Sequence, residues 1–582
     1  MGFDNLMWHL DEGVTDLFGQ WNVYSSVLAT LLIGIVSVFL YVRRDPDTHP
    51  LLLARQAQGS PVRQEGESPV YRSRSSPHSV PLQSGLDVRD PGVSKWARGR
   101  DGDLRDIWRQ AIAGGSTNKN SRGRVLAVYG TETVQETSLD DMTRQISLIG
   151  QHMLDQGGNR VAIYLPNSVE LLAGLFACSF YNMTAILLPF DQTDEALVSM
   201  LRRSAADTVI TAPGCFPFAN VAKSYPALRQ LIWVVDEGSK HLDWNEVPEG
   251  VGGRVNVSTW QDVVGDAAPS AGLSLPPLEE QSAARDISIF WEHEKDSMTT
   301  TTTTTTKTTT LPSDMVRFTS ANLCAAVAAQ LSALPGTQRL GPSDLLLVAD
   351  SLTHTHTLVL VLAALHAGAS VALSSSAPAA LDLTAATRGI APTVVVAGPA
   401  ALLRTHADTV ARLAAVPLAS LLLRWETRSL SDGGVFSEVV SLASRLLDRA
   451  RPAIGTAPGK LRLVYTAERA AAGTPPLSST VLSDLRVFTG ARVLYGLAAA
   501  KVAGVAAQTA FYDYRVVAGG PYAPFGPPLT STEYLLKDTD TCKVANHKLQ
   551  GEIVIRGPSV ANNEAGLGVI GVIRDDNTLA YA

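Results

Sequence analysis

Short apolar runs alternate with longer amphipathic stretches through most of the chain after residue 105. The first series of these runs reads VLAVYG, RVAIYL, TAILLPF, DTVITA and LIWVVD. Each run has the length and composition of a buried strand, and the stretch after it is long enough for a covering helix. This is the rhythm of βαβ units in a parallel sheet. The alternation therefore predicts an α/β fold built on doubly wound sheets.

A second series of apolar runs begins near Asp344. It reads DLLLVADSL, ASVALSS, PTVVVAG, KLRLVYT and ARVLYGL, and the polar, irregular stretch 236–310 separates it from the first series. Two stacked α/β subdomains are therefore expected. The later runs STEYLLKD and GEIVIRG are short strands spaced by turns, and they predict a smaller β-rich subdomain near the carboxyl end.

Composition excludes several classes of protein. A chain of 582 residues is too long for one hydrophobic core, which agrees with several subdomains. The 48 basic and 55 acidic residues leave a net charge of only −7, so nucleic acid is not an expected partner. The four cysteines are widely separated and form no C-x-x-C pair, which argues against a disulfide framework or a zinc site: Cys178, Cys215, Cys324 and Cys542.

The amino-terminal region predicts a membrane anchor. Residues 24–42 contain no charge and are long enough to cross a hydrocarbon core of about 30 Å as a helix. The preceding residues 1–23 are acidic, and Arg43 and Arg44 follow directly. By the positive-inside tendency, the acidic tail should be non-cytosolic and the body cytosolic.

Residues 43–104 are rich in Pro, Ser and Arg, a composition that cannot bury enough apolar area to order itself alone. We interpret this segment as a linker, with a Pro-rich extended arm lying against the body as the alternative. The body would then comprise residues 105–582.

The order of motifs in that body resembles the adenylate-forming superfamily, and in particular its AMP-forming long-chain fatty acyl-CoA synthetases. The clearest similarity is the stretch 160–207, RVAIYLPNSVELLAGLFACSFYNMTAILLPF onward, which resembles the family's strand, "PN" turn, helix, strand and second helix. The resemblance covers nearly everything after residue 105. It implies the fold of the adenylate-forming amino-terminal domain and, in an active member, ATP, magnesium and CoA as cofactors.

The family's phosphate loop, S-G-T-T-G-x-P-K-G, corresponds to the end of a threonine tract. Alignment through Leu311-Pro312 makes Thr308 and Thr309 the two loop threonines, and these are the residues expected to contact any nucleotide. The family's glycines are replaced by Lys307, Thr310 and Asp314, and its lysine by Ser313. β-Branched and acidic residues stiffen such a loop and repel phosphate. A solvated loop and a faulty gene model are the other interpretations of the tract.

Two more stretches resemble family motifs. THTH resembles the family's histidine beside the acyl pocket, which places His354 near any acyl group, on what we interpret as a strand end with His356. No further ligands accompany this pair, so no metal site is predicted. GTPPL, beginning at Gly473, resembles the family's "G-A-x-P-L" motif, and Gly473 is expected to let a nucleotide lie close.

The segment YGLAA resembles the family's "Y-G-x-T-E". Tyr495 matches the family's tyrosine and could still stack on adenine, although packing explains both Tyr495 and Gly473 equally well. The phosphate-binding threonine and the magnesium-binding glutamate are replaced by Ala498 and Ala499. The family's "T-G-D", whose aspartate holds the ribose, corresponds to Leu567-Gly568-Val569; Asp575 or Asp576 would have to substitute. The family's carboxy-terminal cap with its catalytic lysine is absent from this sequence, and no catalytic residue is predicted.

These departures favour a pseudoenzyme: a membrane-anchored, acyl-CoA synthetase-like protein that binds a lipid, a fatty acid or acyl-CoA, or a protein partner. The alternative is an active long-chain fatty acid-CoA ligase in fatty acid metabolism. The endoplasmic reticulum is the expected membrane, ahead of the mitochondrial outer membrane and lipid droplets, because no retention tail or peroxisomal ending occurs. The oligomeric state is not predicted.

Overall fold

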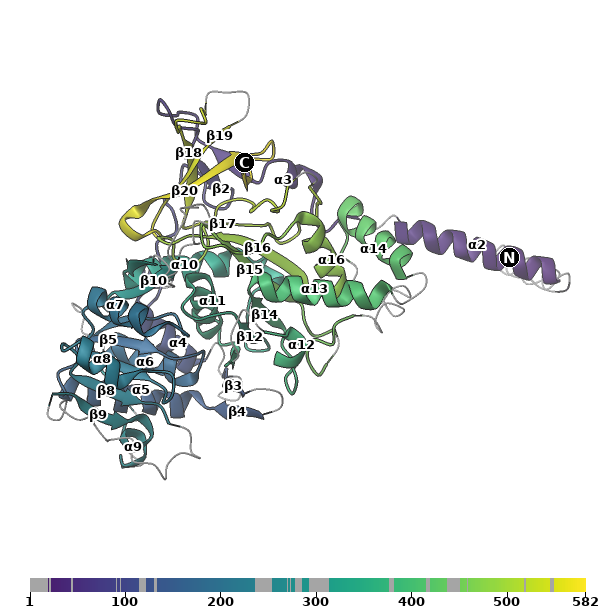
Figure 1. The fold of residues 1–582 in the computed structure, drawn as a ribbon. Helices are drawn as coiled ribbons and strands as arrows, with labels where there is room; N and C mark the ends of the chain where they lie inside the picture. The colour runs from purple at the N-terminus through teal and green to yellow at the C-terminus, as the bar shows by residue number, and fades with distance from the viewer. Residues whose placement is uncertain are drawn as a thin grey trace, which may run out of the picture.

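The computed structural model contains three β-sheets with helices packed around them (Figure 1). It describes residues 19, 22–42, 45–90, 92–94, 96–114, 122–129, 133–235, 254–268, 271–272, 274–277, 285–292, 313–375, 381–414, 419–436, 451–457, 459–517, 520–544 and 549–582. The α/β class with two large sheets and a smaller β-rich part agrees with the sequence prediction.

The first large sheet has seven strands in the order β11-β10-β6-β5-β7-β8-β9, parallel except for β11. The strands are β5 (Arg160–Tyr164), β6 (Thr184–Leu187), β7 (Thr208–Thr211), β8 (Gln230–Trp233), β9 (Asn256–Thr259), β10 (Ile287–Glu292) and β11 (Ser313–Phe318). Its helices are α4 (Leu104–Ala113), α5 (Leu139–Asp155), α6 (Val169–Phe180), α7 (Asp194–Ser204), α8 (Phe218–Ser224) and α9 (Trp260–Gly265). Ser138, Ser168 and Thr193 cap helices α5, α6 and α7 through their side-chain oxygens.

The second large sheet has eight strands in the order β17-β16-β15-β14-β12-β13-β3-β4. They are β3 (Val125–Tyr129), β4 (Thr133–Thr137), β12 (Leu345–Ala349), β13 (Ser370–Ser374), β14 (Val394–Ala397), β15 (Leu463–Arg469), β16 (Arg492–Ala498) and β17 (Ala507–Gln508). Its helices are α10 (Ser320–Ser332), α11 (Thr355–His366), α12 (Leu383–Ala386), α13 (Pro399–Ala414), α14 (Ala419–Gly433) and α16 (Ser479–Thr489), with a 3-10 turn, η3, at Gly336–Gln338.

The membership of three strands differs from the sequence prediction. Strand β3, placed in the first series, pairs in parallel with β13 of the second sheet. Strands β10 and β11 extend the first sheet, although β10 lies in the stretch interpreted as a separator and β11 just after it. Strand pairing is decided by contacts between distant segments, and periodicity within a segment does not report it.

A third sheet has six strands in the order β1-β2-β18-β19-β20-β21. They are β1 (Ala57–Gly59), β2 (Tyr71–Ser73), β18 (Glu533–Lys537), β19 (Gln550–Arg556), β20 (Glu564–Ile573) and β21 (Leu579–Tyr581), with a 3-10 turn, η5, at Ala561–Asn563. Strands β18 and β19 are the two predicted from sequence.

The segment 43–104 is not a free linker over its described residues. Strands β1 and β2 join the third sheet through β18, and the short helix α3 (Pro50–Ala54) precedes them. Arg72 of β2 forms an ion pair with Glu533 of β18 at 2.6 Å. The segment is therefore an arm lying against the body. It is ordered by partners more than 400 residues away in the sequence, which its own composition does not reveal.

Helices α6 and α11 are buried on nearly all sides. Almost every residue of both helices is inaccessible to solvent, and both belong to one core cluster that contains residues of the two large sheets. The side chain of Asn167, in the turn after β5, donates a hydrogen bond to the carbonyl of Asp350 (2.8 Å) and accepts one from the amide of Leu352 (2.9 Å). The predicted "PN" turn thus joins the first sheet to the loop after β12.

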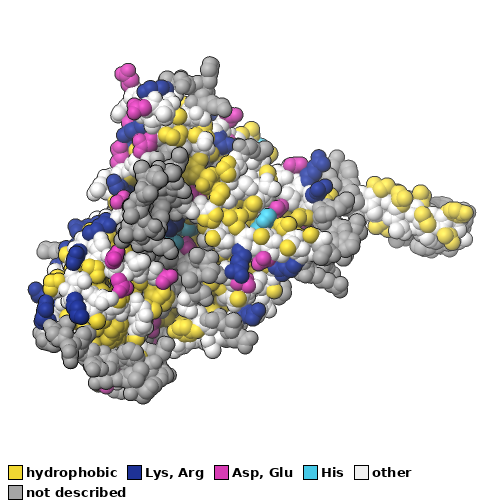
Figure 2. Space-filling model, in the orientation of Figure 1, with side chains coloured by type: hydrophobic (Ala, Val, Ile, Leu, Met, Phe, Trp, Pro, Cys, Tyr) yellow, Lys and Arg dark blue, Asp and Glu magenta, His cyan; other side chains and the backbone are white. Residues whose placement is uncertain are grey.

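Helix α2 (Val23–Val42) projects away from the body (Figure 1). Its large apolar side chains from Val23 to Val36 are between 46% and 84% exposed, and they form much of the surface of the projection in Figure 2. In the part of the chain that the structure describes, no helix combines the length and apolar character that crossing a membrane requires. The predicted transmembrane helix over residues 24–42 is therefore not confirmed.

The packing of the arm gives a stability prediction. Tyr71 of β2 is buried and lies 5.8 Å, centroid to centroid, from the ring of Tyr534. We expect Tyr71→Ala to lower the free energy of unfolding by about 3 kcal/mol, because a large buried side chain leaves a cavity. The exposed Val80, on the same arm, provides the control Val80→Ala, which should change stability by less than about 0.5 kcal/mol. Equal effects in chemical denaturation would show that the arm is not packed in solution.

Candidate functional site

Parallel strands of the second sheet end side by side at one edge, where α/β proteins bind their ligands. Strand β12 runs directly into Asp350, β15 ends at Glu468 and Arg469, and β16 ends at Ala498. Strand β14 lies between β12 and β15, so these residues share one rim of the sheet. The side chains at this rim define the candidate site.

Asp350 and His354 form the best-defined polar pair of the site. His354 Nδ1 lies 3.0 Å from both carboxylate oxygens of Asp350, and Thr357 Oγ1 donates to the same carboxylate at 2.9 Å. Burial alone would raise the pKa of Asp350, but the charge and hydrogen bond of His354 and the hydrogen bond of Thr357 hold it well below its usual range. His354 is the residue before helix α11, so the expected strand end is wrong.

Several buried polar atoms beside this pair have no hydrogen-bond partner among the described residues. They include both ring nitrogens of His356 and the hydroxyls of Thr355 and Thr466. The His356 ring lies 6.3 Å from the ring of Tyr465, and burial lowers the pKa of His356 to about 4. Buried polar groups normally have partners, so this unused capacity suits a ligand or ordered water.

Arg469 brings a buried cation to the same rim. Its guanidinium carbon lies 4.6 Å from the ring centroid of Trp291, which belongs to β10 of the first sheet. Burial lowers the pKa of Arg469, while the charges of Asp350, Glu292 and Glu468 act to raise it. The two sheets thus meet at a cluster that contains the positive charge of Arg469 and the negative charges of neighbouring carboxylates. Among the described residues, however, no group of three or more His, Cys, Asp or Glu side chains is arranged to hold a metal ion.

Tyr495 does not offer a surface to a nucleotide. Its side chain is fully buried within β16, and its ring lies 5.3 Å from Phe525, which in turn contacts Tyr581 at 4.8 Å. Burial raises the pKa of Tyr495 well above its ordinary value. The expected stacking role is therefore not available in this conformation. Ala498 and Ala499, which follow in the motif, are also buried.

The remaining predicted nucleotide residues have separate positions. Thr308 and Thr309 lie outside the described residues. Gly473 is exposed in the loop between β15 and α16, and its φ of 65° favours glycine whether or not a ligand is near. Downstream of the tract, Thr319 and Asn322 form a reciprocal capping box at the start of α10, and Asn322 also donates to the carbonyl of Pro558 at 2.7 Å.

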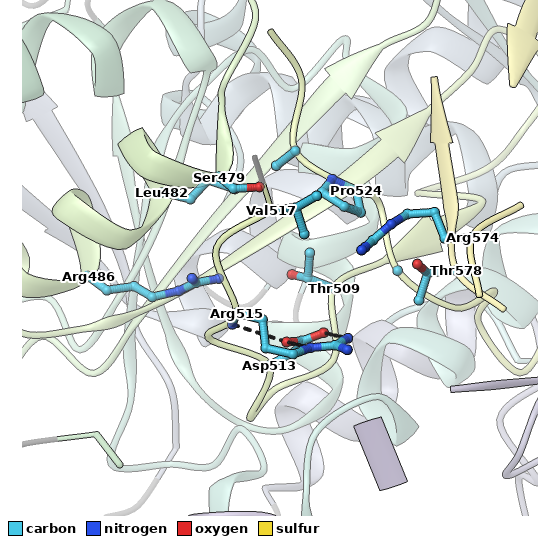
Figure 3. Close-up of a pocket in the computed structure, with 12 residues that line it drawn as sticks. Ser479, Leu482, Arg486, Thr509, Asp513, Arg515, Val517, Pro524, Arg574 and Thr578 are labelled. Carbon is cyan, nitrogen blue, oxygen red and sulfur yellow. Dashed lines mark hydrogen bonds and ion pairs between the residues drawn. The ribbon is translucent and has the colours of Figure 1, made fainter. Parts of the chain in front are cut away.

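Val569, which the resemblance assigns to the place of the family's ribose-binding aspartate, lies in strand β20. Asp576 is buried and already forms ion pairs with Arg515 (2.8 Å) and Arg574 (3.7 Å). Arg515 is also paired with Asp513 at 2.6 Å, as the close-up of this small arginine-lined pocket shows (Figure 3). The carboxylate of Asp576 is therefore engaged in an internal ion-pair network.

Sequence reasoning named His354 and His356 but missed their partners. Asp350 directly follows one apolar strand, and Arg469 is the last residue of another. A charged residue at the carboxyl end of a parallel strand could have indicated the site from the sequence. Trp291 gave no such signal, because its strand was not recognised.

The buried imidazole of His356 gives a pH prediction. Its pKa falls from the ordinary 6.5 to about 4, so the folded state favours the neutral ring. Above pH 6.5 the ring is neutral in both states, and the free energy of unfolding has its full value. As the pH falls toward 4, the unfolded state binds a proton before the folded state does, and the free energy of unfolding decreases by about 3 kcal/mol. We expect His356→Phe to remove this part of the acid sensitivity in denaturation curves between pH 7 and about 4. The control His49→Phe, on the exposed arm, should leave the denaturation curves as in the wild type. If the ring of His356 is solvated in the folded protein, His356→Phe should leave the curves unchanged as well, which would contradict the prediction.

Comparisons with known proteins agree with this geometry. A putative long-chain-fatty-acid CoA ligase from Rhodopseudomonas palustris CGA009 has a TM-score of 0.54 at 16% identity, over 83% of this chain and 98% of that one. The inhibitor-bound N-terminal domain of FACL13 from Mycobacterium tuberculosis has a TM-score of 0.54 at 15% identity, over 82% and 99%. The anthranilate CoA ligase AuaEII with anthranoyl-AMP has a TM-score of 0.55 at 13% identity, over 82% and 76%.

At these identities the likeness concerns the fold alone. No match was found among curated proteins. The family of AMP-binding enzymes matches residues 116–563, which is well over half of the chain. This protein belongs to the family of AMP-binding enzymes, with the adenylate-forming fold of acyl- and aryl-CoA ligases.

Proposed function

We propose that this protein is a non-catalytic member of its family that binds a lipid, namely a fatty acid or acyl-CoA, without activating it with ATP. The observation that carries this proposal is the end of strand β16. Tyr495 is packed in the core, and the two positions that the family resemblance assigns to phosphate and magnesium are the buried methyl groups of Ala498 and Ala499. Neither methyl group can bind a cation or donate a hydrogen bond.

Other parts of the site support the same proposal. Val569 stands where the resemblance places the ribose carboxylate, and Asp576 is engaged by two arginines. Catalysis of adenylate formation needs charge stabilisation of the transferring group, and the loss of one such group typically costs about 100- to 1000-fold in rate. Several losses together leave a scaffold suited to binding.

A ligand-binding role also accounts for the polar side chains at the rim of the second sheet. His354 at the start of α11 and the unpartnered atoms of His356 lie together at the rim of the second sheet. They have hydrogen-bonding capacity for a polar group of a ligand. A protein partner is the other form of the same non-catalytic role.

Calorimetry with ATP tests this proposal. We expect no magnesium-dependent ATP binding by the purified full chain, and thioester formation from ATP, CoA and a long-chain fatty acid at least about 100-fold slower than in an active ligase. The anthranilate CoA ligase AuaEII, assayed with its own substrate, provides the positive control.

Tight magnesium-dependent ATP binding with turnover of the fatty acid would overturn the proposal. It would favour the competing function, an active long-chain fatty acid-CoA ligase. The unpartnered polar atoms around His356 are the feature of the site that leaves room for that function.

We further propose that the protein is held at a membrane, with the endoplasmic reticulum as the first location to examine. The support is the exposed apolar surface of helix α2, which no other described segment covers. Large exposed apolar patches are characteristic of association with a membrane or a partner. A membrane location also suits a protein whose ligand partitions into bilayers.

Vesicle flotation tests the membrane proposal. Full-chain protein should float with phosphatidylcholine vesicles, and the double variant Leu28→Glu/Leu32→Glu should lose most of this association, because two charges on the apolar helix must be desolvated on insertion. Val134→Glu, on the body in β4, is the matched control and should float like the wild type. Equal flotation of all three proteins would contradict a role for α2.

A further inference from the structure

A cavity of about 450 Å³ lies between the amino-terminal arm and the body. The arm contributes helix α3 and the end of strand β2 to its wall, and the body contributes the last turn of α10 and the loops 508–512 and 527–530. Its volume is within the usual range of small-molecule sites, roughly 300 to 1,000 Å³. In Figure 1, α3 lies next to β2, which belongs to the third sheet.

The lining of the cavity is amphipathic. Apolar side chains come from both the arm and the body, including Leu52, Leu53, Phe511 and Leu529. Among the described residues that line it, Arg74 is the one charged side chain, and no aspartate or glutamate accompanies it. The cavity therefore combines an apolar wall with a single uncompensated positive charge.

Arg74 has capacity for an anion. It is exposed, its Nη1 donates to the carbonyl of Arg55 at 3.1 Å, and no described acidic residue forms an ion pair with it. An arginine presents five N–H donors in a planar fork that matches a carboxylate. Most of these donors remain available to a ligand.

We propose that this cavity binds a single-chain amphiphile with a carboxylate head, such as a free fatty acid, with the carboxylate on Arg74 and the chain along Leu53, Phe511 and Leu529. The inference rests on the proposed lipid-binding function and assigns that function to a site. Charge complementarity selects the head group, and the apolar wall selects the chain.

The cavity borders the rim of the second sheet but is lined by other residues, and Asp350, His354 and Arg469 do not belong to its wall. The cavity is lined by Ala329 and Leu529, which pack in one apolar cluster with Trp291 and Ala498 beside the rim. The arm residues of the wall also precede residue 116, where the family match begins. One wall of this site is therefore built by a segment outside the matched part of the chain.

The arm also places the cavity next to an apolar surface. Helix α3 follows α2 after a short connection, and Leu51 and Leu52 of α3 are exposed at 72% and 49%. A fatty acid dissolved in a bilayer would meet these leucines before entering the cavity. The expected source of the ligand is therefore a lipid surface, while the contacts themselves are with the free acid.

Palmitate binding by the full chain, measured by calorimetry, tests the site. We expect saturable binding of about one palmitate, weaker binding of hexadecanol, which has no carboxylate, and a roughly tenfold loss of palmitate affinity in Arg74→Glu. Arg63→Glu, an exposed arginine on the same arm that does not line the cavity, should bind as the wild type does. Ala333→Trp, which fills the cavity, should also weaken binding, with Ala54→Trp on the exposed side of α3 as its control.

The outcomes separate the site from the function. If palmitate binds but Arg74→Glu and Ala333→Trp leave its affinity unchanged, the ligand lies elsewhere, and the site is wrong while the lipid-binding function stands. If the wild type binds neither palmitate nor acyl-CoA, both fail. Thermal unfolding of each variant, with a midpoint matching the wild type, ensures that lost binding is not lost folding.

Discussion

The burial of helices α6 and α11 among the strands of two mostly parallel sheets is the contact on which the rest of the structure depends. Each sheet must cover an apolar face, and these two nearly wholly apolar helices provide the cover inside one continuous core. Asn167 then fixes the loops at the strand ends through two hydrogen bonds to the chain around Asp350. The rim that carries the candidate site is therefore positioned by the core beneath it.

Under the proposed non-catalytic function, the scaffold would persist while its chemistry changes. Packing tolerates alanine at the end of β16, because Ala498 and Ala499 are buried and need no partner. A catalytic rim instead requires oxygen ligands and charges facing a ligand. What remains at this rim is a buried set of polar groups around Asp350, His354 and Arg469, which can bind but which includes no described metal-ligand cluster.

The amino-terminal arm adds a feature that the matched family segment does not contain. It completes the third sheet through β1 and β2, forms one wall of the amphipathic cavity, and connects that cavity to the exposed apolar helix α2. One segment therefore contributes to stability, to a ligand site and to contact with apolar surroundings.

The sequence by itself determined the α/β class, most strands and covering helices, and the apolar residue types at Ala498, Ala499 and Val569, because period and residue type are local properties. Only the tertiary structure decided that β3 belongs to the second sheet, that the supposed linker is an arm, and that Tyr495 is buried against Phe525. It also brought Arg469, at the end of β15, to the loop that carries Asp350 and His354. Strand partners and side-chain neighbours are chosen by contacts across hundreds of residues, and no local pattern encodes those contacts.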